Sequence, residues 1–236
     1  SAIISRFIPS KLTLGFDRFS AREGLSSNFY NQTFKFAYDK NIVERNIALI
    51  SSALKIPIIE ENIQKKLPFL FSSRTYFFKI LSSFKKNILL IPGASFKSKC
   101  YPVEKFAEVA TEIDANFLII WGNQKEKIMA DKIKVLSPKV IICEKLSLDA
   151  LISLISQVDF VLGSDTGPTH MAWALNKSSI TLFGSTPGHR NSYITKNNRI
   201  IESNSEVNPY KIDKNDYSIQ DIDVHEIVQV YEDLLK

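Results

Sequence analysis

The strongest constraint on the fold is a regular alternation of two hydrophobic patterns between residues 87 and 203. Short apolar runs, typical of buried parallel strands, take turns with segments whose apolar residues recur at helical spacing. The predicted strands are residues 87–93, 116–122, 139–143, 158–163, 178–184 and 199–203. The predicted helices between them are residues 102–113, 125–136, 148–156 and 167–175. This order is typical of βαβ units, so we expect an α/β fold with a doubly wound, Rossmann-like parallel sheet.

Four loops rich in glycine and hydroxyl residues follow the predicted strands. They span residues 92–99, 121–126, 163–170 and 184–190. Ligands of doubly wound sheets bind outside the carboxyl ends of the strands. We therefore expect these loops to form the ligand site.

The rest of the chain is less regular. Residues 43–54 predict a helix, residues 21–34 a loop with a short helix, and residues 67–87 a junction between domains. Too few strands precede residue 86 for a second complete doubly wound domain. The expected division is an incomplete N-terminal domain over 1–80, a Rossmann-like domain over 86–215, and an amphipathic C-terminal helix over 221–236 that packs back toward the N-terminal domain.

The stretch "GSDTGPTHMAWAL" (163–175) has the composition of an anion cradle. A helix that begins near Gly167 exposes unpaired N–H groups and a partial positive charge, which suit a phosphate. Thr166 and Gly167 can offer backbone donors, and Ser164 can add a hydroxyl. The alternative is an ordinary strand–turn–helix in which Asp165 or Thr166 caps the helix.

Other loop residues allow both a binding and a structural interpretation. In "PGASFKSKCYP" (92–102), Lys99 can neutralise a diphosphate or be a solvated lysine. Glu126 follows the next strand, where a carboxylate often accepts hydrogen bonds from ribose, but it can equally be a surface glutamate. His170 can donate to a phosphate or serve a structural role.

The composition also limits the kinds of partner and site that this chain is expected to have. The formal net charge is +5, with basic and acidic residues interleaved, which fits either an anionic partner or a general lysine bias. The sequence shows no basic stripe interleaved with aromatics, so no nucleic-acid partner is expected. Two cysteines without zinc spacing predict neither a disulfide framework nor a metal site. No apolar run has the length of a membrane span, and the first residues do not resemble a secretory signal.

Four segments in fixed order carry a resemblance to a known family. The segments "IPGASFKSKCYP", "IIWGNQKEK", "LSLDALISLISQVDFVLGSDTGPTHMAWAL" and "ITLFGSTPG" resemble the C-terminal half of the ADP-heptose glycosyltransferases, which build the inner core of lipopolysaccharide. Residues 15–31 and 43–46 favour the branch of the family that attaches the first heptose. The resemblance implies a GT-B fold, with the nucleotide sugar held mainly by the C-terminal domain.

The resemblance also implies a reaction and a location. The implied reaction is an inverting, metal-independent transfer of heptose from ADP-heptose to Kdo of lipid A, with no cofactor. The implied location is the cytoplasmic side of the inner membrane, with peripheral contact to the lipid. Another GT-B transferase with a different nucleotide sugar, or a nucleotide-binding module without catalysis, remains an alternative. Preference for ADP over UDP or GDP distinguishes transfer of heptose from transfer of another sugar. Turnover distinguishes an enzyme from a nucleotide-binding module without catalysis.

Site residues follow from the same resemblance, position by position. It implies that Lys99 meets the diphosphate, Ser95 lies near the phosphates, Glu126 binds ribose and Leu146 lines the adenine pocket. It further implies that Thr166 and Gly167 give N–H contacts to phosphate, that Asp165 and His170 complete this site, and that Arg22 and Arg45 bind the acidic acceptor. The family's chain extends further before "SAIISRF", and the aspartate proposed as general base lies in that part. We therefore expect the general base outside residues 1–236.

Overall fold

The computed structural model describes residues 2–57 and 60–235. The chain forms two compact units. Unit 1 takes in the chain up to Lys66 together with His189–Asn191 and Pro209–Lys211, and unit 2 consists of Leu67–Gly188, Ser192–Asn208 and Ile212–Lys236.

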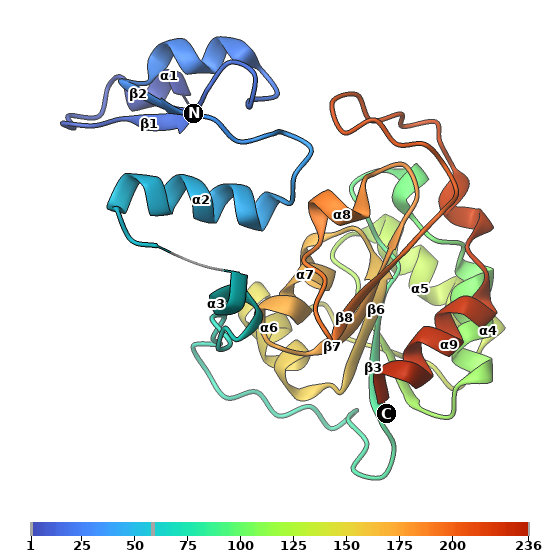
Figure 1. The fold of residues 1–236 in the computed structure, drawn as a ribbon. Helices are drawn as coiled ribbons and strands as arrows, with labels where there is room; N and C mark the ends of the chain where they lie inside the picture. Colours follow the sequence, from blue (N-terminus) through green and yellow to red (C-terminus); the bar gives the residue numbers. More distant parts are fainter. Residues whose placement is uncertain (1, 58–59, 236) are drawn as a thin grey trace. The chain divides into compact units, whose positions relative to one another are not determined.

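Unit 2 is built on a sheet of six strands in which every neighbouring pair is parallel (Figure 1). The strands are β3 (Asn87–Ile91), β4 (Asn116–Ile119), β5 (Ile141–Ile142), β6 (Phe160–Ser164), β7 (Ser178–Phe183) and β8 (Asn198–Glu202). Their order is β5-β4-β3-β6-β7-β8, so the chain moves outward from β3 in one direction and then restarts at β6 in the other. This reversal between β3 and β6 is the topological switch point at which such sheets bind ligands.

Helices cover both faces of this sheet. They are α4 (Val103–Glu112), α5 (Gln124–Leu136), α6 (Leu148–Gln157), α7 (Gly167–Ala174) and α9 (Val224–Leu235), and the connections hold the short elements η2 (Lys97–Lys99), α8 (Gly188–Asn191) and η3 (Ser218–Asp221). Ser147 caps α6 by accepting from the N–H of Ala150, and Asn123 caps α5 by accepting from the N–H of Glu126. The strands and helices predicted between residues 87 and 203 are confirmed to within a few residues at each end.

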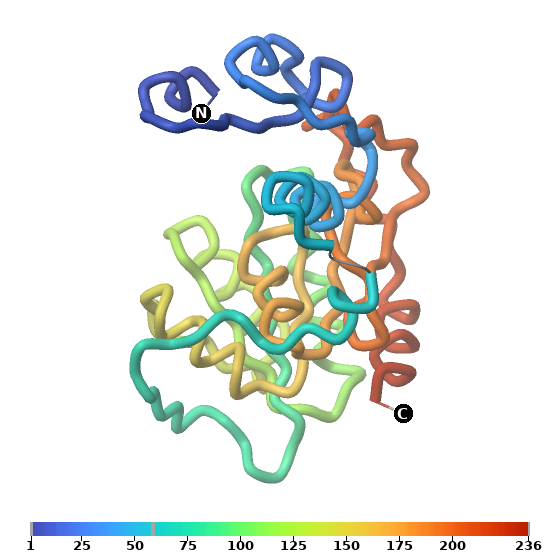
Figure 2. The backbone as a smooth tube through the Cα atoms, turned by 60° about the vertical axis from the view of Figure 1, so that its left-hand side comes forward, coloured from blue at the N-terminus to red at the C-terminus, as the bar shows by residue number. Residues whose placement is uncertain are grey.

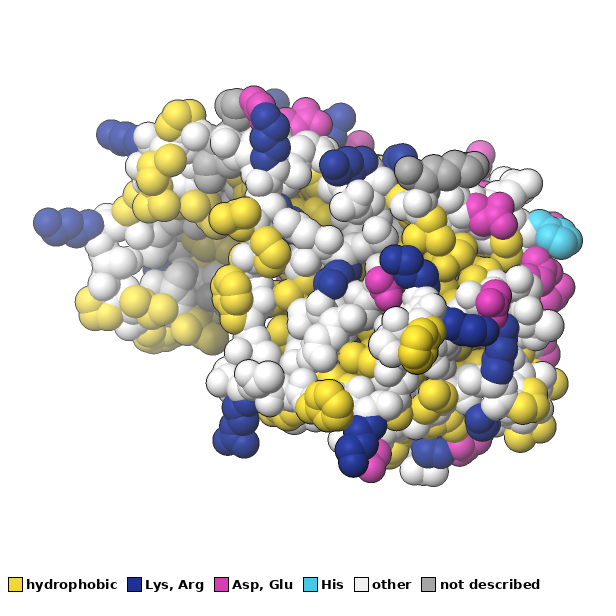
Figure 3. Space-filling model, turned by 90° about the horizontal axis from the view of Figure 1, so that it is seen from below, with side chains coloured by type: hydrophobic (Ala, Val, Ile, Leu, Met, Phe, Trp, Pro, Cys, Tyr) yellow, Lys and Arg dark blue, Asp and Glu magenta, His cyan; other side chains and the backbone are white. Residues whose placement is uncertain are grey.

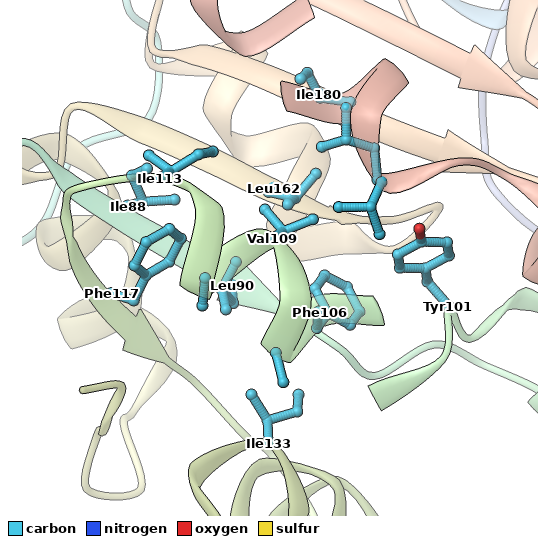
Figure 4. Close-up of a cluster of buried hydrophobic side chains, with 14 of the residues drawn as sticks. Ile88, Leu90, Tyr101, Phe106, Val109, Ile113, Phe117, Ile133, Leu162 and Ile180 are labelled. Atoms are coloured by element: carbon cyan, nitrogen blue, oxygen red, sulfur yellow. The ribbon is translucent and has the colours of Figure 1, made fainter. Parts of the chain in front are cut away.

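Two hydrophobic clusters fill the layers on either side of the sheet. One joins β3, β4, β6 and β7 to α4, α5 and α9, and Figure 4 shows its side chains, with Phe106 and Val109 of α4 directed at Leu90 and Leu162 of the strands. The other lies between the sheet and helices α6 and α7. Both layers cover strands that are buried on their two faces, which explains why these strands have unbroken apolar sequences.

Gly163 of β6 shows how tightly the switch point is packed. A Cβ at this position would lie 2.7 Å from Cβ of Ile91 in β3 and 2.6 Å from the hydroxyl of Thr169 in α7. The glycine therefore lets strand β6 approach its neighbours closely, just before the loop of the predicted ligand site.

Unit 1 holds two short parallel strands and several helices. The strands are β1 (Leu14–Phe16) and β2 (Gln32–Phe34), and the helical elements are α1 (Ala2–Ser5), η1 (Gly24–Phe29), α2 (Ile42–Leu54) and α3 (Glu60–Gln64). The helix predicted over 43–54 is confirmed as α2, and the short helix predicted within 21–34 as η1. The two strands were not predicted.

The boundaries of the units differ from the predicted domains. The segment 67–86 belongs to unit 2, so the boundary falls at residue 66 rather than 80. Figure 2 shows this segment crossing the surface of unit 2 and passing beneath it before it enters β3. Helix α9 also belongs to unit 2, where the ring of Tyr231 packs edge-on against Phe160 of β6 at 4.9 Å between centroids. Its apolar face is therefore buried on the sheet layer of unit 2, and the expected packing toward the N-terminal domain stays a prediction.

Candidate functional site

The carboxylate of Asp165 is the centre of a polar cluster at the carboxyl end of β6. Its side chain is 8% exposed. The ammonium of Lys99 lies 2.6 Å from Oδ2, Nε2 of His170 lies 2.9 Å from Oδ1, and the hydroxyl of Thr186 donates to Oδ2 at 2.9 Å. Three loops that follow different strands thus meet at one carboxylate, as expected for the edge of a parallel sheet.

Electrostatics keep this carboxylate ionised. Burial by itself raises the pKa of Asp165, but the hydrogen bond with His170 and the charge of Lys99 outweigh it and hold the pKa well below its usual range. Asp165 in turn fixes the ammonium of Lys99, whose side chain is only 12% exposed, beside the loop that leads into α7.

The turn after β3 brings Lys99 to this position. Residues Lys97–Lys99 form one 3-10 turn directly after the loop that leaves β3, and the N–H of Lys99 donates to the carbonyl of Phe96. The ring of Phe96 lies 5.4 Å from the ammonium of Lys99 and shields one side of it. Lys97, by contrast, is exposed. The structure therefore distinguishes the two lysines of this loop, which the sequence alone did not.

The first turn of α7 has the form of an anion site. Thr166 is the N-cap residue, and its side chain makes no capping hydrogen bond. The hydroxyl of Thr169 donates backward to the carbonyl of Ser164 instead. A Cβ built on Gly167 meets no atom within 4 Å, so the backbone there faces open space. The side chain of Thr166 therefore does not close the helix start.

A pocket of about 260 Å³ opens beside this helix start. Its lining residues come from the ends of β3 and β4, the loop before α6 and the start of α7: Ile91, Gly93, Ile120, Trp121, Gly122, Glu126, Leu146, Leu151, Thr166 and Pro168. Trp121 is held by a hydrogen bond of 2.9 Å from its ring N–H to the carbonyl of Cys143. The pocket is apolar at Leu146 and Trp121 and polar at Glu126 and Thr166, a combination that suits a base with an attached sugar.

Glu126 joins the pocket to the start of α5. Its carboxylate accepts from the N–H of Gly122 at 2.6 Å and from the side-chain amide of Asn123 at 2.7 Å. These bonds form a reciprocal cap with Asn123, a role of Glu126 that was not predicted. The binding interpretation stands beside it, because each carboxylate oxygen can accept a further hydrogen bond.

Ser95 lies in a neighbouring cavity of about 740 Å³. Gly93 and Glu126 line both this cavity and the pocket beside α7. The side chain of Ser95 is exposed. The structure thus places Ser95 next to the pocket and leaves its predicted contact with phosphate as a prediction.

The two arginines expected to bind the acceptor lie in unit 1 and differ in exposure. Arg22 is exposed. Arg45 is 2% exposed, and its guanidinium donates to the carbonyls of Ser20, Phe36 and Ala37. Its carbon also lies 4.2 Å from the ring centroid of Phe16. The structure thus gives Arg45 a structural role, in which its donors hold two backbone segments of unit 1 together, at Ser20 and at residues 36–37, and its contact with an acceptor stays a prediction.

Sequence reasoning missed Thr186. The residue is 2% exposed and lies in the loop after β7, where "STPG" has the composition of a turn. Its role became visible only when the parallel topology brought the loop beside Asp165.

Two other features concern residues 2–57 and 60–235: metal sites and membrane-spanning helices. No three His, Cys, Asp or Glu side chains converge there as a metal site would require. No helix in these residues is long and apolar enough to span a bilayer.

Comparisons with known proteins agree with this architecture. The chain is 34% identical over 99% of its length to "Lipopolysaccharide heptosyltransferase 1" of Campylobacter coli, and it covers 72% of that protein. Among solved structures, it resembles E. coli heptosyltransferase WaaC with ADP, at a TM-score of 0.75 and 20% identity, over 99% of this chain and 68% of that one. The same enzyme with ADP-2-deoxy-2-fluoro heptose matches at a TM-score of 0.72 and 20% identity, over 98% and 68% of the two chains. The fold is therefore of the GT-B type found in these enzymes. The model of glycosyltransferase family 9 (heptosyltransferase) matches residues 1–218, and the chain belongs to this family.

Proposed function

We propose that this chain takes part in the transfer of heptose from ADP-heptose to Kdo of lipid A, the reaction that a heptosyltransferase I carries out in the lipopolysaccharide inner core. The observation that carries the proposal is the meeting of Lys99, Asp165 and the open start of α7 at the switch point, next to a pocket for a nucleoside. The names of the relatives support it, since one is a heptosyltransferase 1 and another was solved with ADP.

The pocket suggests how the donor is held. Adenine lies against Leu146 and Trp121, and the ribose hydroxyls donate to the carboxylate of Glu126. The diphosphate then reaches the backbone N–H groups of Thr166 and Gly167, at the positive end of α7. Ser95 adds a hydroxyl from the neighbouring cavity.

Negative charge that develops on the leaving diphosphate explains how these residues accelerate the proposed transfer. As the acceptor hydroxyl attacks the anomeric carbon, the bond to ADP breaks and the diphosphate gains negative charge. Lys99 and the helix start stabilise that charge more strongly in the transition state than in the bound donor. Asp165 and His170 lie where a sugar attached to the diphosphate reaches them, and they orient it. The acceptor's acidic groups meet Arg22.

The first test is a calorimetric titration of ADP, UDP and GDP, each with and without a chelator. Binding is expected to be selective for ADP, as the proposed donor requires, and independent of the chelator, because Lys99 supplies the positive charge at the diphosphate. A preference for UDP or GDP would keep the family and discard ADP-heptose as donor. Turnover of ADP-heptose with Kdo-lipid A then separates an enzyme from a binding module.

Substitution of Lys99 gives a sharper test with a matched control. Lys99→Ala removes a charge-assisted hydrogen bond to the diphosphate, so ADP binding weakens by about 1.5–3 kcal/mol. Lys132→Ala removes an exposed lysine of α5 that lines neither the pocket nor the neighbouring cavity, and it leaves ADP affinity unchanged. Equal affinities of the two variants for ADP would refute the assignment of Lys99.

A further inference from the structure

The segment 67–86, which connects the two units along the chain, has an unusual composition. It contains Arg74, Lys79, Lys85 and Lys86 but no acidic residue, and it also contains five phenylalanines and a tyrosine. The sequence was expected to hold no basic stripe interleaved with aromatics, and this segment corrects that expectation. Its basic and aromatic residues do alternate, over a short stretch.

One set of its side chains is used by the fold. Leu70, Phe78, Ile80 and Leu81 pack against the hydrophobic cluster beneath α6 and α7. Phe69 packs edge-on against Trp173, with 5.6 Å between ring centroids. These inward contacts hold the segment on unit 2.

Hydrogen bonds fix the backbone between these contacts. The N–H of Ser73 donates to Asp149 at 2.6 Å, and the side-chain amide of Gln157 donates to the carbonyl of Tyr76 at 3.1 Å. The N–H of Phe69 donates to the carbonyl of Ala174 at 3.2 Å. The segment is therefore an ordered part of the surface of unit 2.

A second set of side chains points outward and contributes little to the fold. Phe71 is 76% exposed, Phe77 85% and Phe84 97%. Exposure of a phenylalanine ring to water is unfavourable in free energy. Three exposed rings along one ordered segment therefore indicate a role other than folding. Arg74 and Lys79 are exposed between them.

The last residues of the segment lie at the amino ends of the strands. The segment leads directly into β3, and Lys86 pairs with Asp159, which precedes β6. Seen from below, this face shows separate hydrophobic side chains with Lys and Arg side chains between them (Figure 3). The middle of the segment lies closer to the pocket beside α7: the N–H of Ser73 donates to Asp149 in the first turn of α6, and Phe77 lines a cavity of about 630 Å³ together with Leu146, which also lines that pocket.

We propose that the segment 67–86 is a docking surface for an anionic lipid bilayer. Phenylalanine side chains at Phe71, Phe77 and Phe84 enter the interface between headgroups and acyl chains, and the basic residues meet the anionic headgroups. The proposed function requires peripheral contact with the membrane, and this docking surface provides that contact. The docking surface therefore rests on the proposed function. Vesicle binding needs no heptose transfer, so each can fail without the other.

A lipid surface fits these residues better than a nucleic acid does. Lys85 pairs with Asp114 and Lys86 with Asp159, so carboxylates already offset two of the four cations. Affinity for nucleic acid depends mainly on the number of phosphates that cations neutralise, and few cations remain here. Membrane binding gains from each buried phenylalanine as well, which explains the outward rings.

The test is co-sedimentation of the purified protein with two kinds of vesicle, pure phosphatidylcholine and phosphatidylcholine mixed with phosphatidylglycerol. The protein is expected to bind the anionic vesicles more tightly, by about fivefold for each basic residue that reaches the surface. The double variant Phe77→Ser, Phe84→Ser is expected to bind them at least about tenfold more weakly. Val135→Ser with Leu136→Ser, which removes exposed apolar side chains from α5 of the same unit, is the control and leaves binding unchanged.

Two further measurements make every outcome decisive. The affinity of each variant for ADP and its tryptophan fluorescence show that unit 2 is still folded, since Trp121 and Trp173 both lie there. Unchanged vesicle binding of a folded double variant overturns the proposal. So does a vesicle-free dimer that the double variant abolishes, or tighter binding of a single-stranded oligonucleotide than of the anionic vesicles.

Discussion

At the scale of single residues, Thr186 positions the carboxylate at the centre of the site. Its hydroxyl donates to the same oxygen of Asp165 that pairs with Lys99, and both residues are buried. Thr186→Val keeps the shape of the side chain and removes the donor, so the free energy of unfolding falls by about 1.5–3 kcal/mol, the range for a hydrogen bond to a charged group.

Urea unfolding followed by tryptophan fluorescence measures this loss. Thr186→Ser retains the hydroxyl and is expected to lose much less stability than Thr186→Val. If serine and valine destabilise the protein equally, the methyl group and its packing explain the effect, and the hydrogen bond to Asp165 does not.

Sequence reasoning found some residues of the site and missed others for a physical reason. Asp165 and Lys99 belong to loops whose charge and glycine content already indicate an anion site. Thr186 is a hydroxyl in a turn, and nothing in its neighbourhood along the chain indicates a buried carboxylate. Arg45 was assigned to the acceptor from the family resemblance, and its neighbours along the chain gave no sign that its guanidinium binds three carbonyls inside unit 1.

At the scale of elements, two glycines of the connection between β6 and α7 differ in the space around them. A Cβ at Gly163 collides with Ile91 and Thr169, whereas a Cβ at Gly167 meets nothing. Gly163→Ala is therefore expected to destabilise unit 2 by about 1–3 kcal/mol through overpacking. Gly167→Ala is expected to keep or slightly raise stability, because alanine suits a helix better than glycine, and to weaken ADP binding where the methyl group meets the phosphate.

Thermal unfolding and ADP titration of the two variants test this contrast. Gly163→Ala is expected to have the lower Tm, and Gly167→Ala the larger loss of ADP affinity. Normal ADP binding by Gly167→Ala would show that the diphosphate does not approach this backbone.

The elements themselves were predictable where a pattern had room to develop. Helix α4 and strand β6 are long enough for a helical period or an unbroken apolar run to stand out. Strands β1 and β2 have three residues each, too few for any period, and the register between them depends on residues far apart in sequence. The segment 67–86 was interpreted as a junction because its inward and outward side chains follow no regular spacing.

At the scale of the whole molecule, the nucleoside pocket and Arg45 belong to different units. Every residue that lines the pocket lies in unit 2, and Arg45 with its three carbonyl partners lies in unit 1. Sequence alone set the boundary at residue 80, because hydrophobic periodicity begins only at 87. Packing of residues such as Leu70 and Phe78 on the sheet layer moves it to 66.

This division predicts that Arg45→Ala loosens unit 1 and leaves ADP binding intact. The substitution leaves the carbonyls of Ser20, Phe36 and Ala37 without their charged donor, at a cost of about 1–3 kcal/mol for each that stays buried. Chymotrypsin is then expected to cleave faster after Phe36 and Tyr38, while the calorimetric affinity for ADP stays that of the unsubstituted chain.

Arg22→Ala is the matched control, since Arg22 is an exposed arginine of the same unit. It is expected to alter neither the cleavage rate nor ADP affinity, although it weakens acceptor binding if its proposed role is right. Arg45→Lys is expected to behave like Arg45→Ala, because an ammonium cannot reproduce the planar fork that reaches three carbonyls. Loss of ADP affinity in Arg45→Ala would mean that unit 1 supports the donor pocket. ADP binding would then depend on both units and not on unit 2 alone.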